Sequence, residues 1–265
     1  VMVSTITQEG AEATLKALEL GAVECIGKPT DLKAEGFSGL ADKVKAAAHA
    51  KVTPLGERHA PSAPSGDYRP SNRYVAIGSS TGGVEALVSI LRGYPENCPP
   101  TVITQHMPAG FTRSLASRLD RLSAAHISEA VDGVPLLPGM VYIAPGGAKH
   151  MEVGKSPQGL RVRLRAGEAV NGHRPSVDVL FRSMAKAAGP KGVGVILTGM
   201  GRDGAQGLKD MADTGAATIG QDEASSVVYG MPRAAFELGA VQRQFVMHKI
   251  ARDILEASAA PVQES

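Results

Sequence analysis

The run Tyr74-Val75-Ala76-Ile77-Gly78-Ser79-Ser80-Thr81-Gly82-Gly83 reads as a buried strand that passes through glycines into a helix starting near Val84. This order of strand, turn and helix is what a nucleophile elbow needs, and the G-x-S-x-G pattern inside it has Ser80 at its centre. The helix N-terminus would offer free N–H groups to a developing oxyanion. The same run could instead cradle a phosphate or form a plain turn, so alone it makes Ser80 only a candidate nucleophile.

The sequence around this run, residues 73–257, alternates β-rich segments with helical patterns. Continuous apolar strands alternating with helices predict an α/β domain with a doubly wound, mainly parallel, Rossmann-like sheet. Residues 139–143, 150–153 and 160–164 surround Gly-rich turns and predict a small antiparallel hairpin insertion. The other expected strands are 74–77, 101–104 and 193–198, and the expected helices are 84–91, 111–122, 177–188 and 205–212.

The chain before this domain divides into two parts. Residues 1–50 read as a β-α-β-α half-domain, with helices expected over 7–20 and 37–50. Because Val1-Met2-Val3 already reads as the inside of a strand, the sequence is expected to begin within a folded unit. Residues 51–72 are rich in proline, glycine and serine and predict a flexible linker, and 258–265 predict a frayed tail.

Composition narrows the function classes. The 265 residues are 43% hydrophobic with a formal net charge of +2, and no run of lysine and arginine concentrates that charge, so neither nucleic acid nor anionic membrane is an expected partner. No stretch approaches the roughly 18 apolar residues of a membrane span, so no membrane insertion is expected. The two cysteines, without CxxC spacing, suit a cytoplasmic setting, and no His and carboxylate spacing predicts a catalytic metal.

Two further polar residues follow predicted strands. His106 follows 101–104 and Asp203 follows 193–198, as Ser80 follows 74–77. Taken singly, His106 could be a loop anchor and Asp203 a turn residue or a helix cap. Together they converge, because parallel strands place ligands at their carboxyl ends. A serine needs a base, and the base needs a group that holds its tautomer, so the three predict a serine hydrolase triad.

His173 is the strongest rival base. It belongs to His173-Arg174-Pro175-Ser176-Val177-Asp178, a polar loop that opens a predicted helix. Asp178 is a candidate cap of that helix, and Arg174 is a candidate partner for a carboxylate. We expect this loop to have a substrate-side or a structural role.

The motifs quoted above, together with Gln105-His106-Met107-Pro108, Leu197-Thr198-Gly199-Met200-Gly201-Arg202-Asp203-Gly204 and Gln221-Asp222-Glu223-Ala224-Ser225, resemble the catalytic domain of chemotaxis protein-glutamate methylesterases, the CheB family. The resemblance implies a triad of Ser80, His106 and Asp203, with Thr81 and Met200 on the oxyanion side. It implies hydrolysis of glutamate γ-methyl esters on the cytoplasmic domain of methyl-accepting chemoreceptors, and in some members deamidation of glutamine. No cofactor is implied for catalysis.

Members of this family carry an N-terminal receiver domain, and residues 1–50 resemble its last part, the back half of a flavodoxin-like fold. Ser4 aligns with the hydroxyl switch residue, and Lys28 with the lysine that precedes a proline. The phospho-accepting aspartate and its acidic cluster are not in this sequence, so Mg2+ is expected only for that missing part. In the intact protein the resemblance implies phosphorylation by a histidine kinase and gating of the active site by the receiver.

Two other function classes stay open. A phosphate- or nucleotide-binding module would use residues 78–83 as an anion loop, but this loop lacks both the G-x-G-x-x-G spacing and a P-loop lysine. An adaptor that only docks receptors would have a catalytically silent Ser80.

Overall fold

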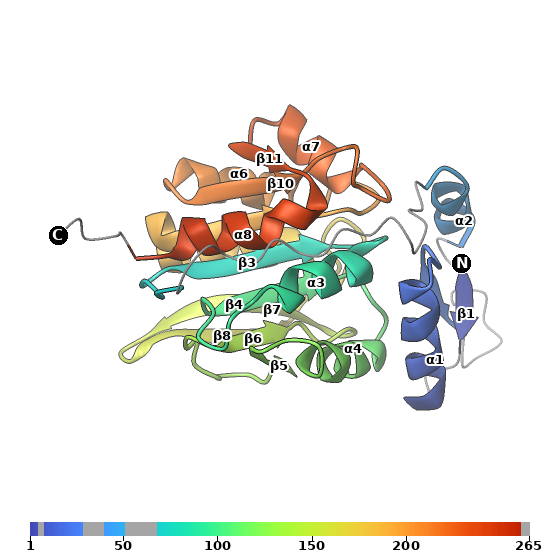
Figure 1. Cartoon of the computed structure of the whole chain (residues 1–265), viewed down its shortest axis with the longest axis horizontal. Helices are drawn as coiled ribbons and strands as arrows, with labels where there is room; N and C mark the ends of the chain where they lie inside the picture. Colours follow the sequence, from blue (N-terminus) through green and yellow to red (C-terminus); the bar gives the residue numbers. More distant parts are fainter. Residues whose placement is uncertain (5–7, 29–39, 51–67, 261–265) are drawn as a thin grey trace.

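The fold was analysed in a computed structural model that describes residues 1–4, 8–28, 40–50 and 68–260 (Figure 1). Most of the expected linker, residues 51–67, and the end of the expected tail, 261–265, lie outside the described residues.

One seven-stranded sheet, in the order β11-β10-β9-β3-β4-β6-β5, forms the centre of the molecule. Every neighbouring pair in it is parallel, as the alternating pattern predicted. The chain runs outward from β3 first to one side and then to the other, so the carboxyl end of β3 lies where the strand order reverses. The strands are β3 (Tyr74–Ser79), β4 (Thr101–Gln105), β5 (His126–Glu129), β6 (Met140–Ile143), β9 (Gly192–Ile196), β10 (Ala217–Gln221) and β11 (Arg243–Phe245).

Helices cover both faces of this sheet. Because successive strand residues point to opposite faces, Val75 and Ile77 pack into one apolar cluster and Ala76 into the other. The first cluster lies under α3 (Gly83–Arg92), α4 (Phe111–Asp120) and α8 (Met247–Ser258). The second lies under α5 (Val177–Ala188), α6 (Ala205–Asp213) and α7 (Met231–Glu237), and a 3₁₀ turn (Gly189–Lys191) follows α5.

The small antiparallel pair consists of β7 (Lys149–Ser156) and β8 (Gly159–Ala166), as predicted for 150–153 and 160–164. The prediction that 139–143 belongs to this insertion is wrong. These residues form β6, which pairs in parallel with β4 and β5 inside the main sheet. Val141 and Ile143 are fully buried in the core, and the turn at Gly139, with φ +83°, only resembles a hairpin turn in sequence.

The N-terminal piece contains β1 (Met2–Ser4), α1 (Gln8–Glu19), β2 (Cys25–Gly27) and α2 (Leu40–Ala48). Strands β1 and β2 pair in parallel. Leu15 and Leu18 of α1 pack into the same apolar cluster as α3 and α4, and Figure 1 shows α1 beside α4 at one end of the sheet. The N-terminal piece is therefore packed against the larger domain.

Packing at the other end of the chain continues past the expected boundary at residue 257. Ser258 is fully buried, and its carbonyl accepts hydrogen bonds from Tyr68 Oη at 3.3 Å and Ser71 Oγ at 2.6 Å. The Ala260 N–H donates to the carbonyl of Arg69. Residues 68–72 and 258–260 thus belong to the packed structure.

Candidate active site

Ser80 lies in the turn between β3 and α3. Its N–H donates to the Thr198 carbonyl at 3.0 Å, and its carbonyl accepts from Gly83 N at 2.8 Å, so the turn is held from both sides. Gly82 has φ +79°, a conformation that glycine adopts without strain. At Gly199 a Cβ atom would lie 2.7 Å from Ser80 Cβ, so the approach of β9 to the turn also requires glycine.

Two adjacent serines occupy this turn, and their surroundings differ. Ser79 is fully buried, and its hydroxyl donates to Gln105 Oε1 at 2.6 Å. Ser80 is half-buried and lines a cavity that His106 also lines. The structure therefore favours Ser80 over Ser79 as the serine that can meet a substrate.

His106 is placed by the pairing of β3 with β4. Ser79 pairs with Gln105 in the register, so Ser80 and His106 are the next residues past the two strand ends. Gln105 Nε2 donates to the carbonyls of both Ser80 and His106, at 2.9 and 3.1 Å, which ties the two loops together. No hydrogen bond joins Ser80 Oγ to His106 in the part of the chain that the structure describes.

The imidazole of His106 is held through one nitrogen only. His106 Nε2 lies 2.8 Å from Asp203 Oδ2 and donates to it, because the carboxylate can only accept. His106 Nδ1 is buried and has no partner among the described residues. The ring is thus fixed as the tautomer whose Nδ1 carries a lone pair, which is the state that a general base requires.

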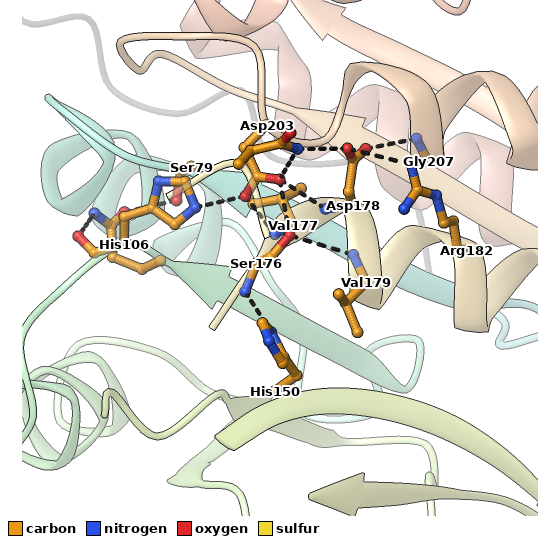
Figure 2. A network of polar contacts seen from close by, with 12 residues as sticks. Ser79, His106, His150, Ser176, Val177, Asp178, Val179, Arg182, Asp203 and Gly207 are labelled. Atoms are coloured by element: carbon orange, nitrogen blue, oxygen red, sulfur yellow. Dashed lines mark hydrogen bonds and ion pairs between the residues drawn. The ribbon is translucent and has the colours of Figure 1, made fainter. Parts of the chain in front are cut away.

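Asp203 is 1% exposed and is surrounded by donors (Figure 2). Its Oδ2 accepts from Val177 N at 2.7 Å as well as from His106, and its Oδ1 accepts from Ser176 Oγ at 2.8 Å and Asn171 Nδ2 at 2.9 Å. Burial raises the pKa of Asp203, but the hydrogen bond and charge of His106, the Asn171 amide and the Val177 N–H outweigh burial and hold that pKa well below its ordinary value. Asp203 is therefore ionised and oriented.

Asp203 also accepts hydrogen bonds from backbone N–H groups at the start of α5, and it does not cap α6. The N-cap of α6 is Gly204, which has no side chain to cap with, whereas Val177 and Asp178 at the first turn of α5 donate their N–H groups to Asp203. The prediction of Asp178 as the α5 cap is wrong, since the N-cap is Ser176, whose side chain accepts from Val179 N. Asp178 instead accepts from Gly207 N at 2.7 Å.

Sequence reasoning missed Asn171, although the dipeptide Asn171-Gly172 is a common tight-turn signal. Its Nδ2 donates to Asp178 Oδ2 at 2.7 Å in addition to Asp203. Arg182 lies 3.5 Å from the same Asp178 oxygen, as Figure 2 shows. The network around the triad thus contains a second buried carboxylate.

His173, the rival base, stacks on His106 with ring centroids 3.7 Å apart and an interplanar angle of 9°. Burial, followed by the nearby His106, lowers the pKa of His173 to about 4, so the ring is neutral at pH 7. Arg174 donates through Nε to the Gly147 carbonyl and through Nη1 to the Gly167 carbonyl, both at 2.8 Å. Arg174 therefore ties two loops together, and His173 packs against the base.

The residues expected on the oxyanion side lie in different settings. Thr81 is buried, and its hydroxyl donates to Glu24 Oε2 at 2.6 Å. Met200 is half-buried in the loop after β9. Neither is among the residues that line the cavity: Leu18, Gly21, Ala22, Val23, Glu24, Cys25, Ser80, Gly82, Val84, Glu85, Gln105, His106, Met107 and Val227.

The cavity lies between the N-terminal piece and the residues of the site. Glu24 and Cys25 lie on one side of the cavity, and Ser80 and His106 lie on the other. Glu24 Oε1 accepts from Cys25 N at 2.9 Å and lies 3.5 Å from Lys43 Nζ, so the carboxylate that reaches Thr81 is anchored in its own domain. The N-terminal piece thus lines part of the cavity and contacts the residue after Ser80 through the Glu24 carboxylate.

Ser4 and Lys28, the expected switch remnants, lie at the carboxyl ends of β1 and β2. Lys28 N donates to the Ser4 carbonyl at 2.7 Å, so the two positions are neighbours. Among the described residues no group of three or more histidine, cysteine, aspartate or glutamate side chains could hold a metal ion, and we derive no step through one. None of the described helices is long and apolar enough to cross a membrane.

Comparison with known proteins gives matches along almost the whole chain. Residues 75–254 match the CheB methylesterase family. A protein-glutamate methylesterase/protein-glutamine glutaminase of Caulobacter vibrioides is 62% identical over 264 residues, covering 98% of this chain and 76% of that protein. One of Agrobacterium fabrum is 53% identical over 266 residues, with the same coverage. The crystal structure of the Thermotoga maritima CheB methylesterase catalytic domain has a TM-score of 0.68 and 40% sequence identity, covering 70% of this chain and 98% of that one.

Proposed function

The chain belongs to the CheB methylesterase family, and we propose that Ser80, His106 and Asp203 perform its hydrolysis of glutamate γ-methyl esters on chemoreceptors, with deamidation of glutamine as a second activity. The observation that carries the residue assignment is the state of His106. Its Nε2 donates to Asp203, while its buried Nδ1 has no partner among the described residues, and His106 lines the same cavity as Ser80. A histidine held in this way can accept a proton from the serine.

The reaction follows from this geometry. Ser80 Oγ attacks the ester carbonyl carbon while its proton passes to His106 Nδ1, and Asp203 stabilises the imidazolium through Nε2. His106 then gives the proton to the methoxy oxygen, and methanol leaves an acyl-enzyme on Ser80. Water attacks this ester, again losing a proton to His106, and the glutamate carboxylate is released as Ser80 regains its proton. With glutamine the leaving group is ammonia.

We propose that N–H groups near Thr81 and Met200 stabilise the oxyanion. Thr81 lies in the turn after β3, and Met200 lies in the loop after β9. The start of α3 supports this assignment, because N–H groups at a helix N-terminus stabilise negative charge. No cofactor enters these steps, and the absence of one stays a prediction.

Gating by the N-terminal piece is part of the proposal. The Glu24 carboxylate contacts Thr81 beside the nucleophile, and it is the same functional group that the reaction releases. Displacing this piece would expose the site, and in the intact receiver a histidine kinase would drive the displacement through phosphorylation, with Mg2+ bound there. We place the protein in the cytoplasm, where the receptor domains and the kinase would meet it.

The test is methanol release from a methylated receptor fragment by the wild type, Ser80→Ala and Ser79→Ala. Removing a nucleophilic serine costs about 10³-fold or more in rate, so Ser80→Ala should be inactive. Ser79→Ala removes a hydroxyl from the same turn but should keep most of the activity. Equal activity of Ser80→Ala and wild type would overturn the assignment, and nucleotide binding without hydrolysis by any of the three would favour a binding module.

A further inference from the structure

A single amide separates two buried carboxylates beside the site. Asp203 is 1% exposed and Asp178 is 3% exposed. Asn171 Nδ2 donates to Asp203 Oδ1 at 2.9 Å and to Asp178 Oδ2 at 2.7 Å, one hydrogen for each carboxylate. Two buried negative charges this close repel each other unless donors lie between them.

The backbone of Asn171 is shaped for this contact. Asn171 has φ +52°, and among the described residues it is the only one other than glycine with a positive φ. With Gly172, at φ +77°, it forms a tight turn closed by two hydrogen bonds between Val170 and His173. Positive φ is uncommon outside glycine and clusters at functional sites. The turn also delivers His173 to its stack on His106.

The donors to Asp203 divide between its two oxygens. Oδ2 accepts from His106 Nε2 and Val177 N, while Oδ1 accepts from the side chains of Ser176 and Asn171 and from Asp178 N. Holding Oδ1 fixes the plane of the carboxylate and so the direction in which Oδ2 points. Of the two described side chains that donate to Oδ1, Ser176 and Asn171, it is Asn171 whose amide also donates to the Asp178 carboxylate.

We propose that Asn171 is a positioning residue for the hydrolysis: its amide screens Asp178 from Asp203 and holds Asp203 Oδ2 on His106 Nε2. This inference rests on the proposed function of the triad. Asn171 does not touch the reacting atoms, and it acts only through Asp203. Removing the amide would let Asp178 repel Asp203. This repulsion would destabilise the ionised form of Asp203 and loosen its hydrogen bond to His106. The charged or titratable groups that face this pair are His106, His173 and Arg182.

The test compares Asn171→Gly, Asn171→Asp and Asn97→Asp by methanol release from a methylated receptor fragment. Asn171→Gly keeps the positive φ without strain and removes the amide. Asn171→Asp keeps the shape and adds a third carboxylate. Asn97, whose amide donates to the Tyr68 carbonyl, is the matched control.

We expect kcat of Asn171→Gly to fall about 10- to 100-fold with KM nearly unchanged, as for a small misplacement of a catalytic group. Asn171→Asp should lower kcat further than Asn171→Gly. A space-filling role predicts the reverse order, because aspartate matches asparagine in shape and glycine does not.

Wild-type kcat in Asn171→Gly, or more activity in Asn171→Asp than in Asn171→Gly, would overturn the inference. Where Asn171→Asp fails to fold, as judged by its melting temperature, Asn171→Gly decides alone. Ser80→Ala is run in the same assay to separate the two claims. An active Ser80→Ala would overturn both the proposed function and this inference, whereas an inactive one beside wild-type-like Asn171 variants would overturn only the inference.

Discussion

Residues of the same type at the site have different surroundings, and these surroundings give them different roles. Ser79 and Ser80 are neighbours in sequence. Ser79 is buried and donates a hydrogen bond to Gln105, whereas Ser80 lines the cavity. His106 and His173 are stacked, yet among the described residues only His106 is hydrogen-bonded to a carboxylate. Residue type alone could not separate these pairs, because burial and partners decide which member can react.

His173 leads to a prediction about pH and stability. Burial lowers the pKa of His173 from 6.5 to about 4, so between those values the unfolded chain binds more protons than the folded one. Stability should therefore fall as pH falls from about 6.5 to about 4, by on the order of 1–2 kcal/mol after discounting for the partial exposure of the ring.

The measurement is urea unfolding of the wild type and of His173→Gln at pH 7 and pH 4.5. His173→Gln should lose less stability between the two pH values than the wild type. His49→Gln, at an exposed histidine of the N-terminal piece, serves as control and should follow the wild type. The same loss in wild type and His173→Gln would show that His173 titrates normally.

The sequence allowed the triad to be predicted because each member follows a buried strand, and parallel strands bring their carboxyl ends together. The role of Asn171 could not be predicted, since its partners Asp178 and Asp203 lie 7 and 32 residues away and meet it only through the packing of α5 against the loop after β9. The cap of α5 was missed for a related reason. Ser176 and Asp178 are both good capping residues. Asp178 does not cap the helix because its carboxylate accepts hydrogen bonds from Gly207 and Asn171, and these contacts depend on the three-dimensional fold.

At the scale of elements, the helices that the sequence predicted match closely, with 177–188 matching α5 and 205–212 matching most of α6. Helices α7 and α8 were not predicted. Strand β6 was assigned to the wrong sheet because short apolar strands look alike whether they pair in parallel or antiparallel. Its partners, Thr101–Gln105 and His126–Glu129, lie on both sides of it in the sheet. Only β5 directly precedes it in the chain, because α4 and β5 separate it from β4. Local sequence does not carry that information.

The contact between Thr81, in the turn before α3, and the N-terminal piece yields a prediction about gating. Glu24→Ala removes the hydrogen bond to Thr81 and should open the site more often. Because a hydrogen bond to a charged group contributes about 1.5 kcal/mol or more, methylesterase activity of the unphosphorylated chain should rise roughly tenfold. Steady-state methanol release measures the change. Glu12→Ala, on the exposed side of α1, is the control, and equal rates for both variants and wild type would mean that this contact does not limit access.

At the scale of the whole molecule, one parallel sheet with helices on both faces places Ser80, His106 and Asp203 in the segments that follow the carboxyl ends of its strands. The N-terminal piece covers that same edge, and it packs through Leu15 and Leu18 on α3 and α4 (Figure 1). The boundaries 1–50, 51–72, 73–257 and 258–265 stay predictions, although residues 68–72 and 258–260 pack against each other. In the proposed mechanism, the position of the N-terminal piece would therefore control the accessibility of Ser80.

The most direct test of the central claim, that Ser80 is a nucleophile activated by His106, is labelling with a serine-directed fluorophosphonate, followed by peptide mass mapping. The label should appear on the peptide that contains Ser80, persist in Ser79→Ala, and disappear in Ser80→Ala and His106→Ala. Unchanged labelling in Ser80→Ala, or a label attached to Ser79, would contradict the account.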